Sequence, residues 1–199
     1  MNAEYHGIYA ALVTPYTSEG KVDYKELQKL VNYLIEKGLD GFYVNGSTAE
    51  AFLLSEEERN NIIKAVVEAN AGRKKVICHV GAISTDQAIG YAKNAEKCGA
   101  DAVSAISPFY YKFSEQEIIQ YYQDIMSATG LPMFIYNFPN FSGFSLTEEI
   151  LEKLKQNKNL IGVKFTSSDM FLLEQIKTLH PELVVWNGFD EMLSAGLIM

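Results

Sequence analysis

The chain has 199 residues, of which 48% are hydrophobic, 12% aromatic and 21% charged, which is typical of a folded globular protein rather than a disordered or fibrous one. Its formal net charge of -8 disfavours nonspecific binding to nucleic acid or to an anionic membrane. Because Arg59 and Arg73 are its only two arginines, few guanidinium groups are available to hold a phosphorylated substrate.

Cysteine content and hydropathy indicate the cellular compartment. Two cysteines, Cys78 and Cys98, are too few for a disulfide framework and are typical of a reducing environment. The first residues lack the basic segment of a signal peptide, and no apolar run approaches the roughly 20 residues that span a bilayer. We therefore expect a cytoplasmic protein.

Short apolar runs alternate with amphipathic runs along the whole chain, and Gly, Pro, Ser or Asp marks the boundaries. The apolar runs predict seven strands, at 8–13, 41–44, 76–80, 102–106, 133–136, 160–164 and 183–186. The amphipathic runs predict helices at 23–37, 56–70, 85–97, 115–128, 147–156 and 169–179, and a further helix that begins at Asp190.

This regular alternation is typical of parallel strands joined by crossover helices. Two α/β architectures fit it, a (β/α)8 TIM barrel and a doubly wound open sheet. No Gly-x-Gly-x-x-Gly turn follows the first predicted strand, which disfavours a dinucleotide-binding open sheet. The sequence therefore predicts one TIM-barrel domain over residues 1–199, with about seven of the eight β/α units.

The length raises a question about the last part of such a barrel. A TIM barrel typically takes about 250 residues, whereas this chain stops in the helix after the seventh predicted strand. An absent eighth strand would leave the first and seventh strands with unpaired edges. We therefore expect a fragment or a shortened gene product.

Two reactive side chains end neighbouring predicted strands, where a TIM barrel carries its active site. Lys164 is the only lysine that directly ends an apolar strand, and burial there would free its amine to form an imine with a carbonyl substrate. Tyr136 ends the preceding strand and could exchange a proton with the reacting group. The alternatives are a rim lysine whose head reaches water and an aromatic cap on the core.

Three loops at the same end of the strands offer binding groups. The segment 46–50 (Gly-Ser-Thr-Ala-Glu) could aim N–H and hydroxyl groups at a carboxylate, or it could be an ordinary Ser/Thr turn. Asp190 and Glu191 could bind the hydroxyls of a polyol, or simply complement a helix dipole. The aromatic loop 107–113 favours a solvent-excluding or subunit contact.

Other chemistries find less support in the sequence. The three histidines, His6, His79 and His180, fall at the chain start, in a strand and at a helix end, so they show no metal-ligand spacing. No Gly-x-Ser-x-Gly elbow occurs, and Cys78 has no evident partner, which disfavours acyl transfer.

Together, the motifs after strands two, four, five, six and seven resemble those of the dihydrodipicolinate synthase and N-acetylneuraminate lyase superfamily of class I aldolases. The resemblance covers essentially the whole chain. The segments 107–114 (Ser-Pro-Phe-Tyr-Tyr-Lys-Phe-Ser), 163–169 (Val-Lys-Phe-Thr-Ser-Ser-Asp) and 187–191 (Asn-Gly-Phe-Asp-Glu) resemble the lyase branch. So does Ser47, where synthases usually have threonine, and the loop after Tyr136 lacks the arginine that is usual in synthases.

The resemblance implies a Schiff-base-forming aldolase that cleaves N-acetylneuraminate (sialic acid) to N-acetylmannosamine and pyruvate, without a metal or organic cofactor. It implies that Lys164 forms the Schiff base and that Tyr136 transfers protons. It also implies that Tyr110 reaches a neighbouring subunit's site in a homotetramer. The residues that it implies for substrate binding are Ser47 and Thr48 at the pyruvate carboxylate, and Thr166, Gly188, Asp190 and Glu191 at the sugar tail.

Two departures from the family pattern keep alternatives open. Ala49 stands where the family usually has glycine, and the C-terminal third with the last barrel strand is absent. One alternative is a related pyruvate-dependent aldolase, such as dihydrodipicolinate synthase or a 2-keto-3-deoxy sugar acid aldolase. An alternative of another class is a truncated, catalytically inactive binding or subunit-interaction protein.

Overall fold

A computed structural model of the chain describes residues 3–199; the first two residues of the predicted 1–199 domain lie outside the described part. Its centre is one curled sheet in which the strands follow each other in chain order and every neighbouring pair is parallel. The seven strands are β1 (Tyr9–Ala11), β2 (Gly41–Val44), β3 (Lys75–His79), β4 (Ala102–Ile106), β5 (Met133–Asn137), β6 (Leu160–Phe165) and β7 (Val184–Asn187).

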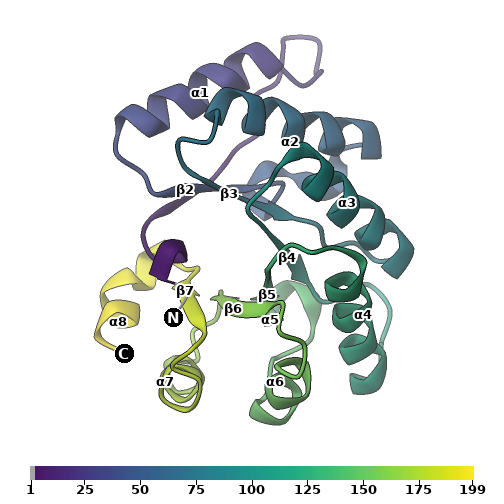
Figure 1. Cartoon of the computed structure of the whole chain (residues 1–199), viewed down its shortest axis with the longest axis vertical. Coiled ribbons are helices and arrows are strands. Elements are labelled where there is room, and N and C mark those ends of the chain that lie inside the picture. Colours follow the sequence, from purple (N-terminus) through teal and green to yellow (C-terminus); the bar gives the residue numbers. More distant parts are fainter. Residues whose placement is uncertain (1–2) are drawn as a thin grey trace.

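The helices lie along the outer face of this sheet, and the chain ends lie on the side where the curl is open (Figure 1). They are α1 (Tyr24–Glu36), α2 (Glu56–Asn70), α3 (Thr85–Cys98), α4 (Glu115–Ala128), α5 (Pro139–Ser142), α6 (Glu148–Leu154), α7 (Met170–Leu179) and α8 (Leu193–Ile198). Short 3-10 turns are η1 (Ala3–Tyr5), η2 (Ser47–Ala49), η3 (Ala51–Leu53) and η4 (Asp190–Met192). None of the helices in residues 3–199 has both the length and the apolar character to span a membrane.

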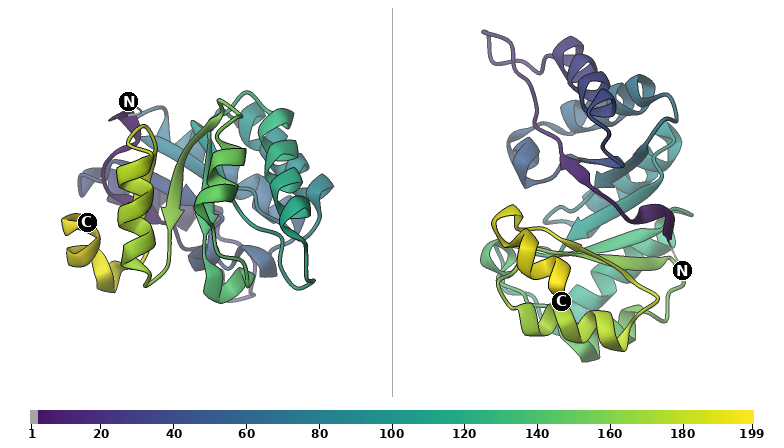
Figure 2. Two further views of the ribbon diagram at one scale, coloured as in Figure 1. Left: turned by 90° about the horizontal axis from the view of Figure 1, so that it is seen from below. Right: turned by 90° about the vertical axis from the view of Figure 1, so that its left-hand side faces the viewer.

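The strand order decides between the two predicted architectures. A doubly wound sheet reverses direction at a switch point, whereas a barrel adds each strand beside the previous one. The unbroken order β1 to β7 is that of a barrel, so the prediction of a partial TIM barrel is confirmed. Figure 2 shows the open side of the sheet, where β1 and β7 are not paired with each other.

Local sequence signals place the elements close to their predicted bounds. Ser55 and Ser114 form reciprocal capping boxes at the starts of α2 and α4, and both helices span the predicted residues. The prediction missed α5, which Pro139 begins and which ends at Gly143 with φ +68. The helix predicted from Asp190 begins instead as the turn η4 and continues as α8.

The alternation of side chains along each strand separates two apolar clusters. In β5, Met133 and Ile135 pack against the helices, whereas Phe134 and Tyr136 point into the curl of the sheet. Inside the curl, the ring of Trp186 from β7 stacks on Phe134 with centroids 4.0 Å apart. Side chains that point inward, and not those of the outer cluster, therefore determine what the carboxyl ends of the strands can bind.

Side chains also connect the two edges of the open sheet. The indole N–H of Trp186 donates to the carbonyl of Tyr5 at 2.8 Å, and its ring lies 4.6 Å from the ring of Tyr9 in β1. An aromatic contact thus spans the interior between the first and last strands, although no backbone hydrogen bond of residues 3–199 pairs them.

Candidate active site

The amine of Lys164 lies inside the curl of the sheet, between two aromatic rings. Lys164 belongs to β6 and stands in register with Tyr136 of β5. Its Nζ is 4.0 Å from the ring centroid of Tyr136 and 3.9 Å from that of Tyr43 in β2. The predicted proximity of Lys164 and Tyr136 is therefore present in the structure.

The surroundings of Lys164 disfavour its charged form. Burial lowers the pKa of the amine to about 7, and the more distant negative charge of Asp190 opposes this shift only in part. No ion pair within residues 3–199 involves Lys164. A pKa lowered this far leaves uncharged amine near neutral pH, and this form can attack a carbonyl carbon.

The phenol of Tyr136 lies beside two hydroxyl groups. Tyr136 is 4% exposed, and burial raises the pKa of its phenol, while the nearby hydroxyls of Ser47 and Thr166 act in the opposite direction. The Thr166 hydroxyl is buried and has no hydrogen-bond partner among residues 3–199. A buried hydroxyl without a partner costs free energy unless a ligand satisfies it. The carboxyl ends of β2, β5 and β6 thus bring one amine, one phenol and two hydroxyls together.

The turn after β2 presents backbone N–H groups at the mouth of this site. Ser47 to Ala49 form the 3-10 turn η2, and no hydrogen bond within residues 3–199 uses the N–H groups of Ser47 or Thr48. Ala49 is buried, and its carbonyl accepts from the hydroxyl of Thr14 at 2.7 Å. The left-handed backbone falls at Glu50, with φ 56, so alanine at position 49 brings no strain.

A buried histidine that the sequence analysis left without a role supports this turn. The Nδ1 of His79 lies 2.9 Å from the carbonyl of Asn45, and its Nε2 accepts from the N–H of Ile106 at 3.2 Å. This pairing requires the neutral imidazole with its proton on Nδ1. Burial and the nearby positive charges of Arg59 and Lys164 hold the pKa of His79 well below its usual range.

Arg59 extends the same network from α2. Its Nη2 donates to the carbonyl of His79 at 3.1 Å, and its guanidinium lies 3.9 Å from the ring centroid of Tyr91. The carbonyl of Arg59 in turn accepts from the side-chain amide of Asn45 at 2.9 Å. Asn45 has φ 58, and this network holds it in that conformation immediately before the turn. The sequence gives no periodic signal for such a contact.

The residues after β6 and β7 form the opposite side of the mouth. The N–H of Gly188 donates to the carbonyl of Phe165 at 2.7 Å, and a Cβ at Gly188 would overlap the hydroxyl of Thr166. A side chain at position 188 would therefore displace the Thr166 hydroxyl. Asp190 and Glu191 are exposed in η4, and of the two only Asp190 is close enough for its charge to act on Lys164.

The aromatic loop after β4 does not bring Tyr110 to Lys164 of the same chain. Tyr110 is 84% exposed, has φ 77, and packs its ring against Tyr111 with centroids 5.0 Å apart. Beside this loop lies an apolar cavity of about 270 Å³, whose lining includes Ser47, Phe109 and Phe141. The predicted role of Tyr110 in a neighbouring subunit stays a prediction.

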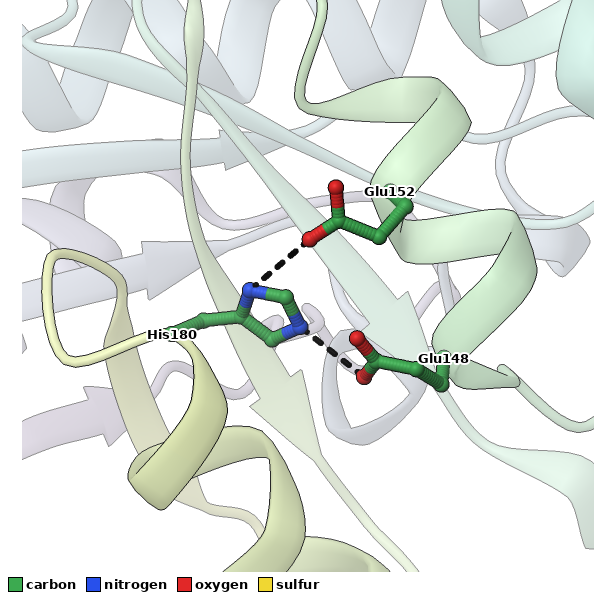
Figure 3. A group of neighbouring side chains, drawn as sticks. All are labelled: Glu148, Glu152 and His180. Carbon is green, nitrogen blue, oxygen red and sulfur yellow. Dashed lines mark hydrogen bonds and ion pairs between the residues drawn. The ribbon is translucent and has the colours of Figure 1, made fainter.

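A separate cluster of potential metal ligands lies away from the strand ends, between α6 and the end of α7. The ring of His180 stands between Glu148 and Glu152, with one carboxylate near each of its nitrogens (Figure 3). The ammonium of Lys155 lies 2.6 Å from Nδ1 of His180 and 3.3 Å from Glu152. The ammonium of Lys155 already pairs with Glu152, and one metal ion cannot use both edges of the ring. This cluster therefore connects two helices.

A parallel sheet in barrel order, with a half-buried lysine that makes no ion pair within residues 3–199 at the carboxyl end of β6, defines a TIM-barrel protein with a candidate site at that end. The chain belongs to the dihydrodipicolinate synthetase family, whose model matches residues 4–199. It is 44% identical over 199 residues to N-acetylneuraminate lyase 2 of Escherichia coli O6:H1, covering 100% of this chain and 65% of that protein.

Two solved structures are similar along nearly the whole chain. The Ruminococcus gnavus sialic acid aldolase with a mutated catalytic lysine matches with a TM-score of 0.97 and 32% identity, over 100% of this chain and 66% of that one. CdNal from Clostridium difficile, in complex with mannosamine, matches with a TM-score of 0.95 and 35% identity, over 98% and 67%. The chain thus spans about two thirds of the length of the proteins that it matches.

Proposed function

We propose that this protein is a class I aldolase that cleaves N-acetylneuraminate to N-acetylmannosamine and pyruvate, with Lys164 as the Schiff-base residue. The observation that carries the proposal is the desolvated amine of Lys164, which contacts the rings of Tyr43 and Tyr136 and has a pKa of about 7. The names of the relatives, a N-acetylneuraminate lyase and a sialic acid aldolase, supply the substrate.

The proposed reaction begins when the uncharged Lys164 amine adds to the C2 ketone of open-chain N-acetylneuraminate. Uptake of one proton and loss of one water give an iminium, which withdraws electrons from the C3–C4 bond. Tyr136 relays a proton in this step: its phenol oxygen accepts the proton of the C4 hydroxyl as the bond breaks and N-acetylmannosamine leaves, while its own phenolic proton passes to C3. The enamine is thereby protonated at C3, and hydrolysis of the imine releases pyruvate. No step requires a metal or an organic cofactor.

The substrate is held from two sides in this proposal. Ser47 and Thr48 bind the carboxylate through their hydroxyls and their unused N–H groups, since a short turn with free N–H groups suits an anion. Thr166, Gly188, Asp190 and Glu191 contact the hydroxyl-bearing tail of the sugar. The buried and unpartnered hydroxyl of Thr166 supports this assignment because a ligand hydroxyl would satisfy it.

Two sequence features favour the lyase over a dihydrodipicolinate synthase. Ser47 takes the place of the usual synthase threonine, and residues 137–147 contain no arginine that could bind the second carboxylate of a synthase substrate. The test compares kcat/KM for pyruvate release from N-acetylneuraminate with kcat/KM for condensation of pyruvate with aspartate semialdehyde. We expect the first to exceed the second by at least about 100-fold, a difference of about 2.7 kcal/mol.

A reversed ratio would assign the chain to the synthases. The same assay addresses the alternative of an inactive binding protein. A chain that releases no pyruvate from N-acetylneuraminate above the rate of its Lys164→Ala variant would be such a protein, and the proposal would be wrong.

The proposal includes a cytoplasmic homotetramer in which Tyr110 completes a neighbouring subunit's site. Its support is the exposure of Tyr110 at 84% and of Tyr111 at 66% in one loop beside the candidate site, since large exposed aromatic groups favour subunit contacts. The two free cysteines agree with a reducing compartment. Sedimentation of Tyr110→Ser against the unmodified chain tests the contact, and an unchanged mass would contradict it.

A further inference from the structure

Two rings enclose the Lys164 amine, and the proposed reaction gives a role only to Tyr136. The other ring belongs to Tyr43, which is 2% exposed. Its hydroxyl donates to Ser104 Oγ at 3.0 Å. Because this hydrogen bond ties the hydroxyl to β4, the part of Tyr43 that meets the amine is the face of its ring.

The geometry of this contact is that of a cation–π interaction. The 3.9 Å between Lys164 Nζ and the Tyr43 ring centroid is well inside the roughly 6 Å limit for such contacts. Since β2 and β6 are not neighbours in the sheet, Tyr43 reaches the amine across the interior of the curl. The rings of Tyr43 and Tyr136 meet edge to face at 78°, so together they fix the position of the amine.

We propose that Tyr43 is a catalytic residue whose ring face stabilises positive charge on the Lys164 nitrogen, in the ammonium and then in the iminium formed with a 2-keto acid. This inference rests on the proposed function, because that function requires the iminium. In its formation the neutral amine adds to the keto carbon, one proton is taken up, and one water leaves. The nitrogen becomes positive directly against the Tyr43 ring, which therefore favours the adduct over the free amine.

The other groups that face the amine supply little of this stabilisation. His79 from β3 is neutral because burial lowers its pKa, so it neither attracts nor repels a positive charge on the amine. Tyr136 from β5 stays protonated because burial raises the pKa of its phenol. Asp190 from η4 is exposed, so solvent and salt screen its charge. With no ion pair at Lys164 among residues 3–199, the ring faces are the main cation partners in contact.

The test replaces the ring and follows Lys164 in two ways. Competitive acetylation at a series of pH values, read on the Lys164 peptide by mass spectrometry, gives the pKa of the amine, and pyruvate titration with borohydride trapping gives the imine dissociation constant. In Tyr43→Leu we expect the Lys164 pKa to fall by about one unit and the imine to weaken about tenfold, or about 1.4 kcal/mol. Tyr43→Phe keeps the ring, and we expect the Lys164 pKa to change by less than about 0.3 unit and the imine dissociation constant by less than about twofold.

Tyr9→Leu is the matched control for removal of an inward-facing ring. Tyr9 packs on Trp186, and within residues 3–199 the rings that lie against the Lys164 amine are those of Tyr43 and Tyr136, so we expect the Lys164 pKa to be unchanged in Tyr9→Leu. A Lys164 pKa that rises toward its ordinary value in Tyr43→Leu, or that stays unchanged, would show that the ring only excludes water, and would overturn the inference.

A second series keeps the test decisive if Tyr43→Leu does not fold. Phenylalanine, 3,5-difluorophenylalanine and pentafluorophenylalanine at position 43 preserve the shape of the ring while they weaken its negative face. We expect the Lys164 pKa to fall stepwise along this series. A Lys164 pKa that does not change with fluorination would overturn the inference. Acetylation measures the Lys164 pKa without any substrate. Failure to cleave N-acetylneuraminate would therefore refute the proposed function, whereas a Lys164 pKa that does not depend on the Tyr43 ring would refute the role of Tyr43.

Discussion

Lys164 and Lys75 lie at opposite ends of the same sheet, and their surroundings give them opposite properties. Lys75 begins β3, where its ammonium pairs with Glu4 at 2.7 Å and with Asp101 at 3.2 Å, and these partners raise its pKa. Lys164 lies at the carboxyl end of β6 without an ion pair in residues 3–199, and burial lowers its pKa to about 7. The difference lies in burial and partners rather than in residue type.

The comparison agrees with the division of labour in a TIM barrel. Charge pairing at the amino ends of the strands contributes to stability, whereas the carboxyl ends carry the chemistry. A desolvated ammonium without a partner carboxylate costs stability, and the same cost favours the neutral amine that the proposed reaction requires. We therefore expect substitutions of Lys164 to lower activity without lowering stability, and substitutions of Lys75 or its partners to lower stability without lowering activity.

The largest expected effect is the loss of activity in Lys164→Ala. Without the amine no imine forms, and we expect kcat for pyruvate release from N-acetylneuraminate to fall by roughly 10⁴- to 10⁶-fold. Lys75→Ala serves as the matched control at the other end of the sheet, with kcat expected within about threefold of the unmodified chain. Equal losses in the two variants would remove the distinction between the two ends.

Tyr136→Phe separates imine formation from proton transfer. The ring remains against the Lys164 amine, so we expect pyruvate to form a trapped adduct as in the unmodified chain. Loss of the phenolic proton carrier should lower kcat for cleavage by about 10²- to 10⁴-fold. An unchanged kcat would assign the proton transfer to another group, and loss of the adduct would show that the hydroxyl acts earlier.

Lys164→Met should stabilise the protein near neutral pH. The folded pKa of about 7 lies below that of an unfolded lysine, so the unfolded state binds more protons between about pH 7 and 10.5, and stability rises with pH in that window. Methionine removes this penalty, and urea unfolding should show a gain of roughly 2–4 kcal/mol at pH 7 that shrinks to below about 1 kcal/mol at pH 10. A gain that does not depend on pH would contradict the lowered pKa.

The smallest effect is expected from Asp101→Asn. The carboxylate of Asp101 pairs with Lys75 and accepts from the N–H of Val76 at 2.8 Å; an asparagine keeps the second contact and loses the charge. We expect the free energy of unfolding to fall by about 0.5–1 kcal/mol, less at high salt, with the Lys164 adduct unchanged. A changed adduct would mean that the two ends of the sheet are coupled.

Much of the fold was predictable because each strand and helix carries its own local signal. Alternation of apolar and amphipathic runs located all seven strands, and Ser or Thr caps located several helix starts. Lys164 and Tyr136 could be found because each ends a strand, and carboxyl ends of neighbouring parallel strands meet.

The rest of the site depends on contacts across the interior that no local pattern reveals. Tyr43 contacts Lys164 although β2 and β6 are not neighbouring strands. The alternation of side chains along β2, which points Tyr43 into the curl, is the one sequence signal that could have suggested this contact. The contact of His79 with Asn45 requires the left-handed backbone of Asn45, which the network with Arg59 imposes. Such contacts join residues that are distant in the sequence, so they can be identified only when the three-dimensional arrangement of the strands is known.

The most direct test of the account is borohydride reduction of the chain in the presence of pyruvate, followed by peptide mass mapping of all fifteen lysines. We expect one reduced adduct, on Lys164, whose yield falls below about pH 7 as the amine becomes charged. An unmodified Lys164, or an adduct spread over exposed lysines, would contradict it.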